Sequence, residues 1–262
     1  MVDIVYVLGP HSQWGNNELK YSIRSVLKHV KNFGTIWIVG FHPNIELDAP
    51  TRFIPVPQNS YSKMANIRSN LREISLTPEC SERFIYMNDD FFFIQDVDVE
   101  TMPSYFCGTL GLYCANFSQE FYPYWRSMCY TWAVLSAFGY GTKNFEVHGP
   151  LPMEKSKMNA ALNLKATDSN LQIRSIYANL HGGPMEYMSD CKVGLKKDPD
   201  FNLEKMFDLV KGRQFFSTGD ELPDECKAVF EELYPKVGFK TYPTVTYQPA
   251  VDKQWEAFVY AI

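Results

Sequence analysis

Strand-like apolar runs alternate with amphipathic helical runs through the first third of the chain, and this alternation most limits its fold. Residues 3–8 and 35–41 are nearly continuously apolar and rich in β-branched and aromatic side chains, as in strands covered on both faces. Between them, Leu19, Ile23 and Val26 recur at helical spacing. A strand, a helix and a strand within about 40 residues predict a βαβ unit with parallel strands.

The same alternation leads into the segment RFIYMNDDFFFI at residues 83–94. A second amphipathic run spans residues 64–74, and the strand-like FIYM after it ends at the polar triplet Asn88, Asp89 and Asp90. We therefore predict an α/β fold: a mostly parallel central sheet flanked by helices, with a helical C-terminal part. The triplet should lie just past the carboxyl end of a central strand, where ligands of open α/β sheets bind.

Two adjacent carboxylates on a regular strand point to opposite faces, so Asp89 and Asp90 converge only where the backbone turns. Hard divalent cations such as Mg²⁺ or Mn²⁺ take carboxylate oxygens and share their other positions with water and substrate phosphates. We expect Asp89 and Asp90 to bind such a metal beside a diphosphate. The alternative is that Asn88 and Asp89 only cap a turn, as these residue types often do.

Other polar residues are candidates for catalysis or phosphate binding. His148 lies in a loop rich in Gly and Pro, where an imidazole can act as a general base or phosphate contact; alternatively it is an incidental surface residue. Arg24, Arg68 and Arg174 interrupt amphipathic helical patterns, and an arginine can hold a phosphate by two parallel hydrogen bonds or pair with surface acids. Lys63, near Arg68, is a further candidate, or part of a solvated helix face.

Composition excludes some classes of partner and leaves others open. The formal charge of -5 provides no global positive field toward nucleic acid or anionic lipid. The start MVDIVYVLGP resembles a strand rather than an export signal, and no apolar run approaches the about 20 residues of a membrane helix. The 6 cysteines form no C-x-x-C pair, so we expect them to be reduced in a cytoplasmic protein.

The second half of the sequence predicts further helices and an aromatic belt. The belt, residues 118–142, is expected to be mainly core, because aromatic clusters usually are. Helices are expected near residues 154–165, 169–180, 203–211 and 223–234.

The order of several segments resembles the Stealth family of hexose-1-phosphate transferases. NNELKYSIRSV is similar to the family's "ELRYSLRSI" element, and RFIYMNDDFFFI is similar to its "FIYFNDDFF" element. VHGP, QIRSIYAN and FFSTGDELPDECKAVFEELYPKVGF then resemble its later motifs in the same order. Together the matches span residues 3–241, and the NDD and ELKYSIRS blocks are the specific ones.

The resemblance implies a nucleotide-sugar transferase of the GT-A kind, with one catalytic domain over residues 1–262. Residues 1–110 would form the half that binds the nucleotide sugar, and residues 111–262 the acceptor half. It implies Asp89 and Asp90 at the metal and diphosphate. The catalytic residues expected are His148, Arg174 and Asp90. The donor-binding residues expected are Gly9, Arg24, Lys63, Arg68, Asn88 and Asp89.

The sequence also departs from the family pattern. The family's opening "YTWVDG" segment carries an acidic residue, whereas VYVLGPHSQW has none after Asp3, and Gly9 instead begins a loop suited to approach a phosphate. The group transferred to the acceptor would therefore be either the sugar or the sugar-1-phosphate. The resemblance extends to phage-encoded glycosyltransferases, which would act in the host cytoplasm on an acceptor hydroxyl of a glycan or of a hydroxylated nucleobase in DNA. The amphipathic C-terminal tail is suited to docking on the body or on a second copy as a homodimer.

Two other functions remain as alternatives at this point. One is a metal-dependent nucleotide-sugar phosphohydrolase, which would use the same carboxylates with water as the nucleophile. The other is a non-catalytic module that binds a glycan or nucleotide, with the aromatic belt as its platform.

Overall fold

The computed structural model describes residues 1–10, 12–58, 62–116, 122–164, 170–195, 198–219, 223–236, 238 and 242–247. Its central sheet has the strand order β12-β4-β3-β1-β5-β9. These strands are β1 (Val2–Leu8), β3 (Phe33–Gly40), β4 (Thr51–Pro55), β5 (Arg83–Met87), β9 (Leu151–Glu154) and β12 (Val245–Thr246).

The pairing of these strands confirms the predicted α/β class. β1 pairs in parallel with β3 on one side and with β5 on the other, β3 pairs in parallel with β4, and β4 with β12. Only β9 runs antiparallel, against β5. The chain thus leaves β1 toward β3 and β4 and later returns to β1's other side as β5. The carboxyl ends of β1 and β5 form the switch point at which such sheets bind ligands.

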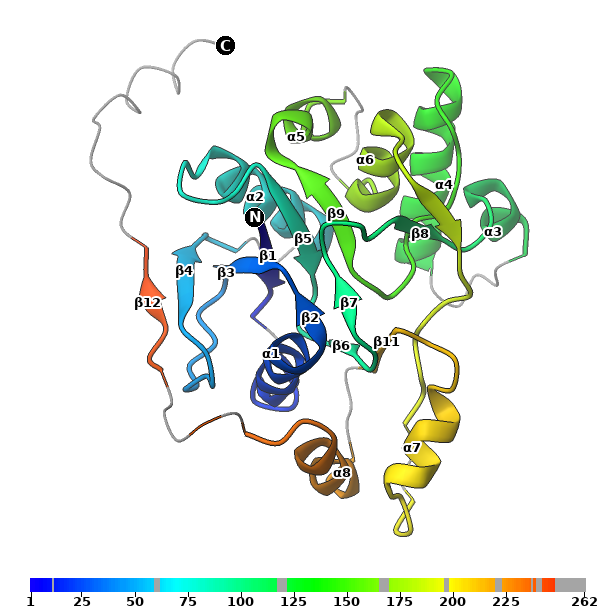
Figure 1. The fold of residues 1–262 in the computed structure, drawn as a ribbon. Coiled ribbons are helices and arrows are strands. Elements are labelled where there is room, and N and C mark those ends of the chain that lie inside the picture. Colours follow the sequence, from blue (N-terminus) through cyan, green and yellow to red (C-terminus); the bar gives the residue numbers. More distant parts are fainter. Residues whose placement is uncertain are drawn as a thin grey trace.

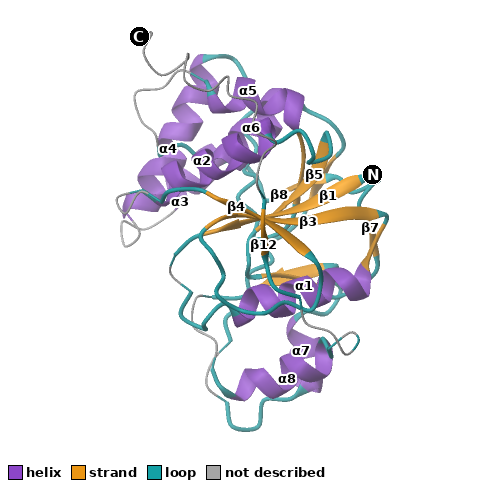
Figure 2. Ribbon diagram, turned by 90° about the vertical axis from the view of Figure 1, so that its left-hand side faces the viewer, coloured by secondary structure: helices purple, strands orange, loops and turns teal. Residues whose placement is uncertain are grey.

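Helices cover both faces of the sheet, as Figures 1 and 2 show. On one face, alternate β1 residues such as Tyr6 pack with Ile23 of α1 (Asn17–His29). On the other face, Val5 of β1 packs with Leu71 of α2 (Lys63–Leu76). Helices α5 (Lys155–Leu162) and α6 (Ile173–His181) contribute to this second layer. Residues two apart share a face of a strand, so the continuously apolar sequence of β1 follows from burial on both sides.

Smaller elements extend this framework. The remaining helices are α3 (Leu110–Asn116), α4 (Tyr122–Ala137), α7 (Leu203–Leu209) and α8 (Glu225–Leu233). The remaining strands are β2 (Val30–Lys31), β6 (Phe91–Phe93), β7 (Val97–Asp98), β8 (Ser104–Phe106), β10 (Met185–Tyr187) and β11 (Phe215–Ser217). A separate apolar cluster under α7 and α8 includes Phe92, Phe216 and Phe230. The four helices expected in the second half are confirmed as α5, α6, α7 and α8.

One expectation about the second half was wrong. The aromatic belt is not mainly core, because five of its described aromatic side chains are 36% to 54% exposed. These are Tyr124, Tyr130, Trp132, Phe138 and Tyr140. Apart from Tyr140, they lie on α4 or just after it, and α4 packs on α3 and α6 with only part of its surface. Phe121 of the belt and the tail from residue 248 lie outside the described residues.

No helix in the described ranges combines the length and the apolar character that crossing a membrane requires.

Candidate active site

The polar triplet forms a tight turn at the switch point of the sheet. The N–H of Phe91 donates to the carbonyl of Asn88 over 3.4 Å, and the Tyr86 hydroxyl donates to the Asn88 side chain over 2.7 Å. Beyond the turn, Phe91, Phe92 and Phe93 are fully buried. The turn therefore stands on a rigid apolar base, and the location predicted for the triplet is confirmed.

The two aspartates of this turn perturb each other's ionisation. Burial, followed by the charges of Asp90 and Glu18, raises the pKa of Asp89 to about 8. Burial also raises the pKa of Asp90, although a 2.8 Å hydrogen bond from the Ser217 hydroxyl to its Oδ2 atom opposes the shift. The positive charge of Lys63 lowers both pKa values. Two close carboxylates in a poorly solvated place form a site that a cation would stabilise.

The donor set fits a hard divalent cation that keeps water and substrate ligands. Asp89 and Asp90 offer carboxylate oxygens, which suit Mg²⁺ or Mn²⁺. In the described part of the chain, no three His, Cys, Asp or Glu side chains form a group that could enclose a metal. Two protein carboxylates completed by substrate phosphates are typical of Mg²⁺ sites.

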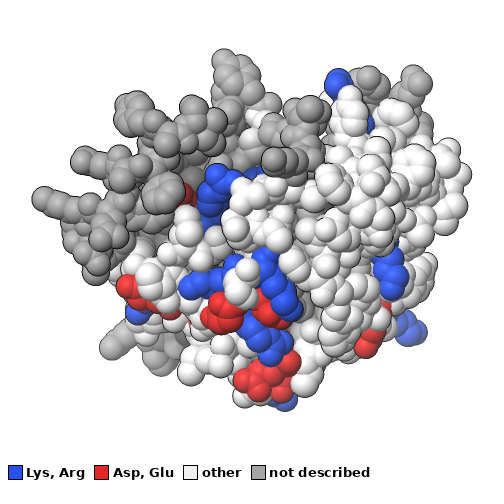
Figure 3. All heavy atoms as spheres, turned by 90° about the horizontal axis from the view of Figure 1, so that it is seen from above, with Lys and Arg blue, Asp and Glu red and all other residues white. Residues whose placement is uncertain are grey.

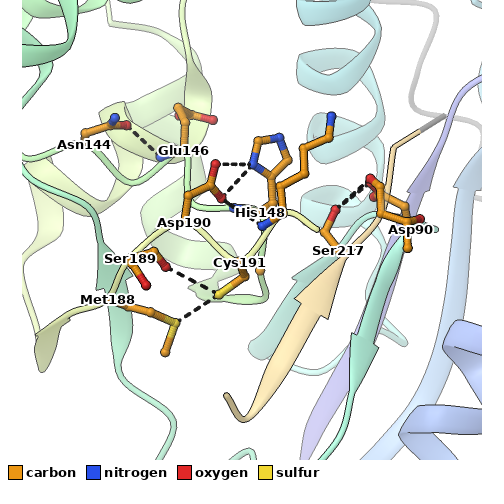
Figure 4. A network of polar contacts seen from close by, with 12 residues as sticks. Asp90, Asn144, Glu146, His148, Met188, Ser189, Asp190, Cys191 and Ser217 are labelled. Atoms are coloured by element: carbon orange, nitrogen blue, oxygen red, sulfur yellow. Dashed lines mark hydrogen bonds and ion pairs between the residues drawn. The ribbon is translucent and has the colours of Figure 1, made fainter. Parts of the chain in front are cut away.

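A second polar unit, His148 with Asp190, lies beside the turn (Figure 4). The His148 Nδ1 atom lies 2.8 Å from Oδ1 and 3.0 Å from Oδ2 of Asp190, and the His148 backbone N–H donates to the same carboxylate over 3.1 Å. Burial alone would raise the pKa of Asp190, but the hydrogen bond and charge of His148 lower it to about 2. Because an ionised carboxylate only accepts hydrogen bonds, Nδ1 carries the proton. Nε2 then remains available as a base.

A short ladder of backbone hydrogen bonds brings this pair next to the acidic turn. Strand β11 pairs antiparallel with β6, which places Ser217 opposite Phe91. On its other side, the Ser217 N–H donates to the Cys191 carbonyl over 3.1 Å, and the Val193 N–H donates to the Ser217 carbonyl over 2.8 Å. Ser217 therefore stands between Asp90 and the segment that begins with Asp190 (Figure 4).

Arg174 is a buried cation at the same place. Its Nη2 atom donates to the Gly149 carbonyl over 2.6 Å, and its guanidinium lies 5.4 Å from the ring centre of Tyr86 and 5.5 Å from that of Phe91. The side chain is 7% exposed, and among the described residues its Nε atom has no hydrogen-bond partner and no carboxylate lies within ion-pair distance of it. A buried guanidinium without an acidic partner is suited to an anionic ligand.

Glycine at position 149 is required by packing. A Cβ atom there would lie 2.1 Å from the Phe215 ring, so a larger residue would displace the loop that carries His148. The glycine of the VHGP motif therefore has a local structural reason.

The structure does not bring every candidate to this place. Arg24 is buried and donates to Asp48, to Glu231 over 2.6 Å and to the Tyr234 carbonyl over 3.1 Å. These contacts favour a structural role in joining α1 to α8.

Arg68 donates through Nη2 to the Leu162 carbonyl, which joins α2 to α5, and among the described residues its buried Nη1 atom has no hydrogen-bond partner. Gly9 is exposed and directly follows β1, next to β5 in the sheet, and an added Cβ atom would meet nothing within 4 Å. Among the sequence candidates, Lys63, His148 and Arg174 thus lie near the triplet, and Gly9 directly follows the neighbouring strand β1.

Asp190, Ser217 and Glu18 are the residues of this site that sequence reasoning missed. Ser217 lies in the FFSTGDELP segment and Glu18 in the ELKYSIRS segment, so the motif matches pointed to their neighbourhoods without naming them. Asp190 stands alone in MSDCK with no recognisable pattern. Its role depends on the contact with His148, 42 residues earlier.

The fold is that of an α/β protein with an acidic turn at the carboxyl edge of a mostly parallel sheet. No family model matches the chain, and no curated protein matches it. Among solved structures, it is similar to an active-site mutant of LgtC. The TM-score is 0.45 and the sequence identity 14%, over 88% of this chain and 95% of that chain. A similarity at this level assigns no function to this chain.

Proposed function

We propose that this protein is a divalent-metal-dependent transferase that moves a sugar-1-phosphate or a sugar from a nucleotide sugar to an acceptor hydroxyl. The observation that carries the proposal is the acidic turn, Asp89 and Asp90, beside the His148–Asp190 pair at the switch point of the sheet. The motif resemblance to the Stealth family supports the same class of reaction.

The acidic turn would hold the metal and the donor diphosphate. A bound Mg²⁺ or Mn²⁺ would supply positive charge that stabilises the negative charge growing on the leaving phosphate. Lys63, whose charge already acts on both carboxylates, would contact the same phosphates. Gly9 would allow the donor to approach the end of β1, since it carries no side chain and no described atom lies within 4 Å of where its Cβ would be.

His148 would take the proton of the acceptor hydroxyl. Its Nδ1–H is held by Asp190, so Nε2 is the free base, and the Asp190 charge stabilises the imidazolium that forms. Asp190 here acts by fixing the tautomer and orientation of the ring.

Arg174 favours transfer of the sugar-1-phosphate. Its buried guanidinium, held on the carbonyl next to His148, is placed to bind a phosphoryl group near the base. The acceptor oxygen would then bond to the sugar-bearing phosphorus and the P–O bond to the nucleotide would break, which releases a nucleoside monophosphate. Transfer of the sugar alone would break the C–O bond and release a nucleoside diphosphate.

Product analysis tests this function. The protein is incubated with Mn²⁺, a panel of nucleotide sugars and mixed glycan acceptors, and ³¹P NMR identifies the nucleotide released and any new phosphodiester. We expect acceptor-dependent monophosphate release that EDTA, Asp89→Asn and His148→Gln abolish and Asp208→Asn, an exposed aspartate on α7, leaves intact. Hydrolysis that no acceptor accelerates would instead identify a phosphohydrolase.

A further inference from the structure

A cavity lies between the start of α2 and α4. It has a volume of about 480 Å³, within the range of about 300–1,000 Å³ typical of small-molecule sites. Residues 62–64, at the start of α2, line one side, and the rest of the lining comes from α4 and residues 170–172. Most of the lining thus belongs to the half of the chain after residue 111.

Segments that carry residues of the proposed active site line the cavity. Lys63 lines it at the start of α2, and its charge acts on Asp89 and Asp90. Gln172 lines it and lies two residues before Arg174 in the sequence. Tyr124 lines it from α4, and the charges that act on its hydroxyl include those of Glu146, Arg174 and Asp190.

The lining combines tyrosine rings with positive charge. Arg126 lies 5.1 Å from the ring centre of Tyr130, and its Nη2 atom donates to the Tyr130 hydroxyl over 2.9 Å, which fixes the guanidinium over the ring. Lys63 adds a second cation at the start of α2, and the first turn of that helix contains no acidic side chain. No Asp or Glu occurs among the described residues of the lining. Rings of tyrosine pack on sugar or aromatic rings, and the positive helix end and the cations favour an anion.

We propose that this cavity is the acceptor site and that the acceptor is a sugar carrying a carboxylate or a phosphate. The identity of this ligand as the acceptor rests on the proposed function, but its binding in the cavity does not require the metal. The donor is assigned to the ends of β1 and β5, which leaves the cavity lined by α4 for the second substrate.

A small anionic sugar fits the surface better than a DNA strand does. On the face in Figure 3, basic and acidic side chains lie side by side, and the formal charge of the chain is -5. A polyanion is bound through a run of phosphate contacts along a basic groove, whereas a single anionic group can be bound by one cation of the cavity, Arg126.

Direct binding in the absence of metal and donor tests the inference. Isothermal titration calorimetry compares methyl glucuronide and glucose 6-phosphate with the neutral methyl glucoside, and a short single-stranded oligonucleotide serves as the DNA arm. We expect at least one anionic sugar to bind about tenfold or more tightly than the glucoside, and Arg126→Gln to remove most of that preference. The matched control Arg72→Gln removes an exposed arginine of α2 that contacts Asn163, and should change nothing.

The possible results distinguish failure of the acceptor-site proposal from failure of the proposed transferase function. Equal affinity for charged and neutral sugars, an Arg126→Gln variant that binds like the wild type, or preferred binding of the oligonucleotide would overturn it. Asp89→Asn should still bind the anionic sugar even though it cannot transfer, so loss of transfer alone does not count against the cavity. Conversely, efficient transfer to a neutral acceptor would support the proposed transferase activity and refute the proposal that the acceptor is anionic.

Discussion

His148 and the carboxylate of Asp190 are joined by three contacts, two from the ring atom Nδ1 at 2.8 and 3.0 Å and one from the His148 backbone N–H at 3.1 Å. The carboxylate therefore holds both the ring and the loop that carries it. This arrangement leaves one ring nitrogen for chemistry, and the acidic turn with Asp90 lies beside it (Figure 4).

Replacing Asp190 by Asn should lower kcat without weakening metal binding. The amide loses the charge that stabilises the imidazolium, so we expect kcat to fall about 100-fold, within the usual contribution of general base catalysis. Steady-state kinetics with Mn²⁺ titrations would show it, and Asp200→Asn, another exposed aspartate, is the control. Because the pKa of Asp190 is about 2, activity changes between about pH 5 and pH 9 should not come from its own titration. An unchanged kcat would refute the role of the pair.

Asp89→Asn should make the metal-free protein more stable. The pKa of Asp89 is about 8 in the folded state and 3.8 when unperturbed, so the native state keeps a proton that the unfolded state has lost. This group's contribution to the free energy of unfolding therefore falls as pH rises from about 4 to about 8. At about pH 8 we expect the variant to gain at least about 1 kcal/mol, roughly one pKa unit.

Urea unfolding in EDTA at about pH 5 and about pH 8 measures this gain, which should be larger at the higher pH. Asp208→Asn is the surface control. A stability difference that stays constant or shrinks with rising pH would contradict the assignment of the raised pKa to Asp89.

Mn²⁺ affinity should rise with pH in the same range. A metal needs the ionised carboxylates, so below the Asp89 pKa of about 8 binding must release a proton. We expect the dissociation constant to increase by up to about tenfold for each pH unit below that value. Calorimetric titration in buffers of different ionisation enthalpy would count the proton released. Affinity independent of pH would place the metal elsewhere.

Alanine substitution should lower stability at Gly149 and leave it nearly unchanged at Gly9. Gly149→Ala puts a Cβ atom 2.1 Å from the Phe215 ring, so we expect a loss of about 1–3 kcal/mol in the free energy of unfolding. Gly9→Ala meets no neighbouring atom and should change stability by less than about 0.5 kcal/mol. If Gly9 faces the donor, its variant should nevertheless raise the KM for the nucleotide sugar. A Gly9→Ala enzyme with a normal KM for the nucleotide sugar would contradict the assignment of Gly9 to the donor site.

Arg24→Met distinguishes a structural from a donor-binding arginine. The substitution leaves the buried Asp48 carboxylate unpaired, so we expect a loss of about 3–5 kcal/mol in stability. Adding Asp48→Asn should recover part of the loss, because it removes the unpaired charge. The KM for the donor, measured below the unfolding temperature, should stay normal. A raised KM with little loss of stability would return Arg24 to the donor site.

Much of the core could be predicted from local patterns. The continuously apolar runs around Val5 and Trp37 predicted strands buried on both faces, and the structure buries both residues completely. The spacing of Leu19 and Ile23 predicted α1, because period 3.6 is a property of the helix itself. Exposure in the second half was less predictable: the aromatic residues of α4 have the composition of a core, but whether a ring is covered depends on which elements pack against it.

The sequence by itself determined the acidic turn. The pattern of FIYM followed by Asn88, Asp89 and Asp90 predicted a strand end carrying two carboxylates, and that depends only on neighbours along the chain. Tertiary structure decided what faces those carboxylates. Asp190 reaches His148 only because the segment after it pairs with Ser217, and β11 pairs with β6. Arg24 forms ion pairs with Asp48 and Glu231, which lie 24 and 207 residues away in the sequence. Long-range pairing of this kind is set by packing and backbone hydrogen bonds across the whole fold, so no local pattern records it.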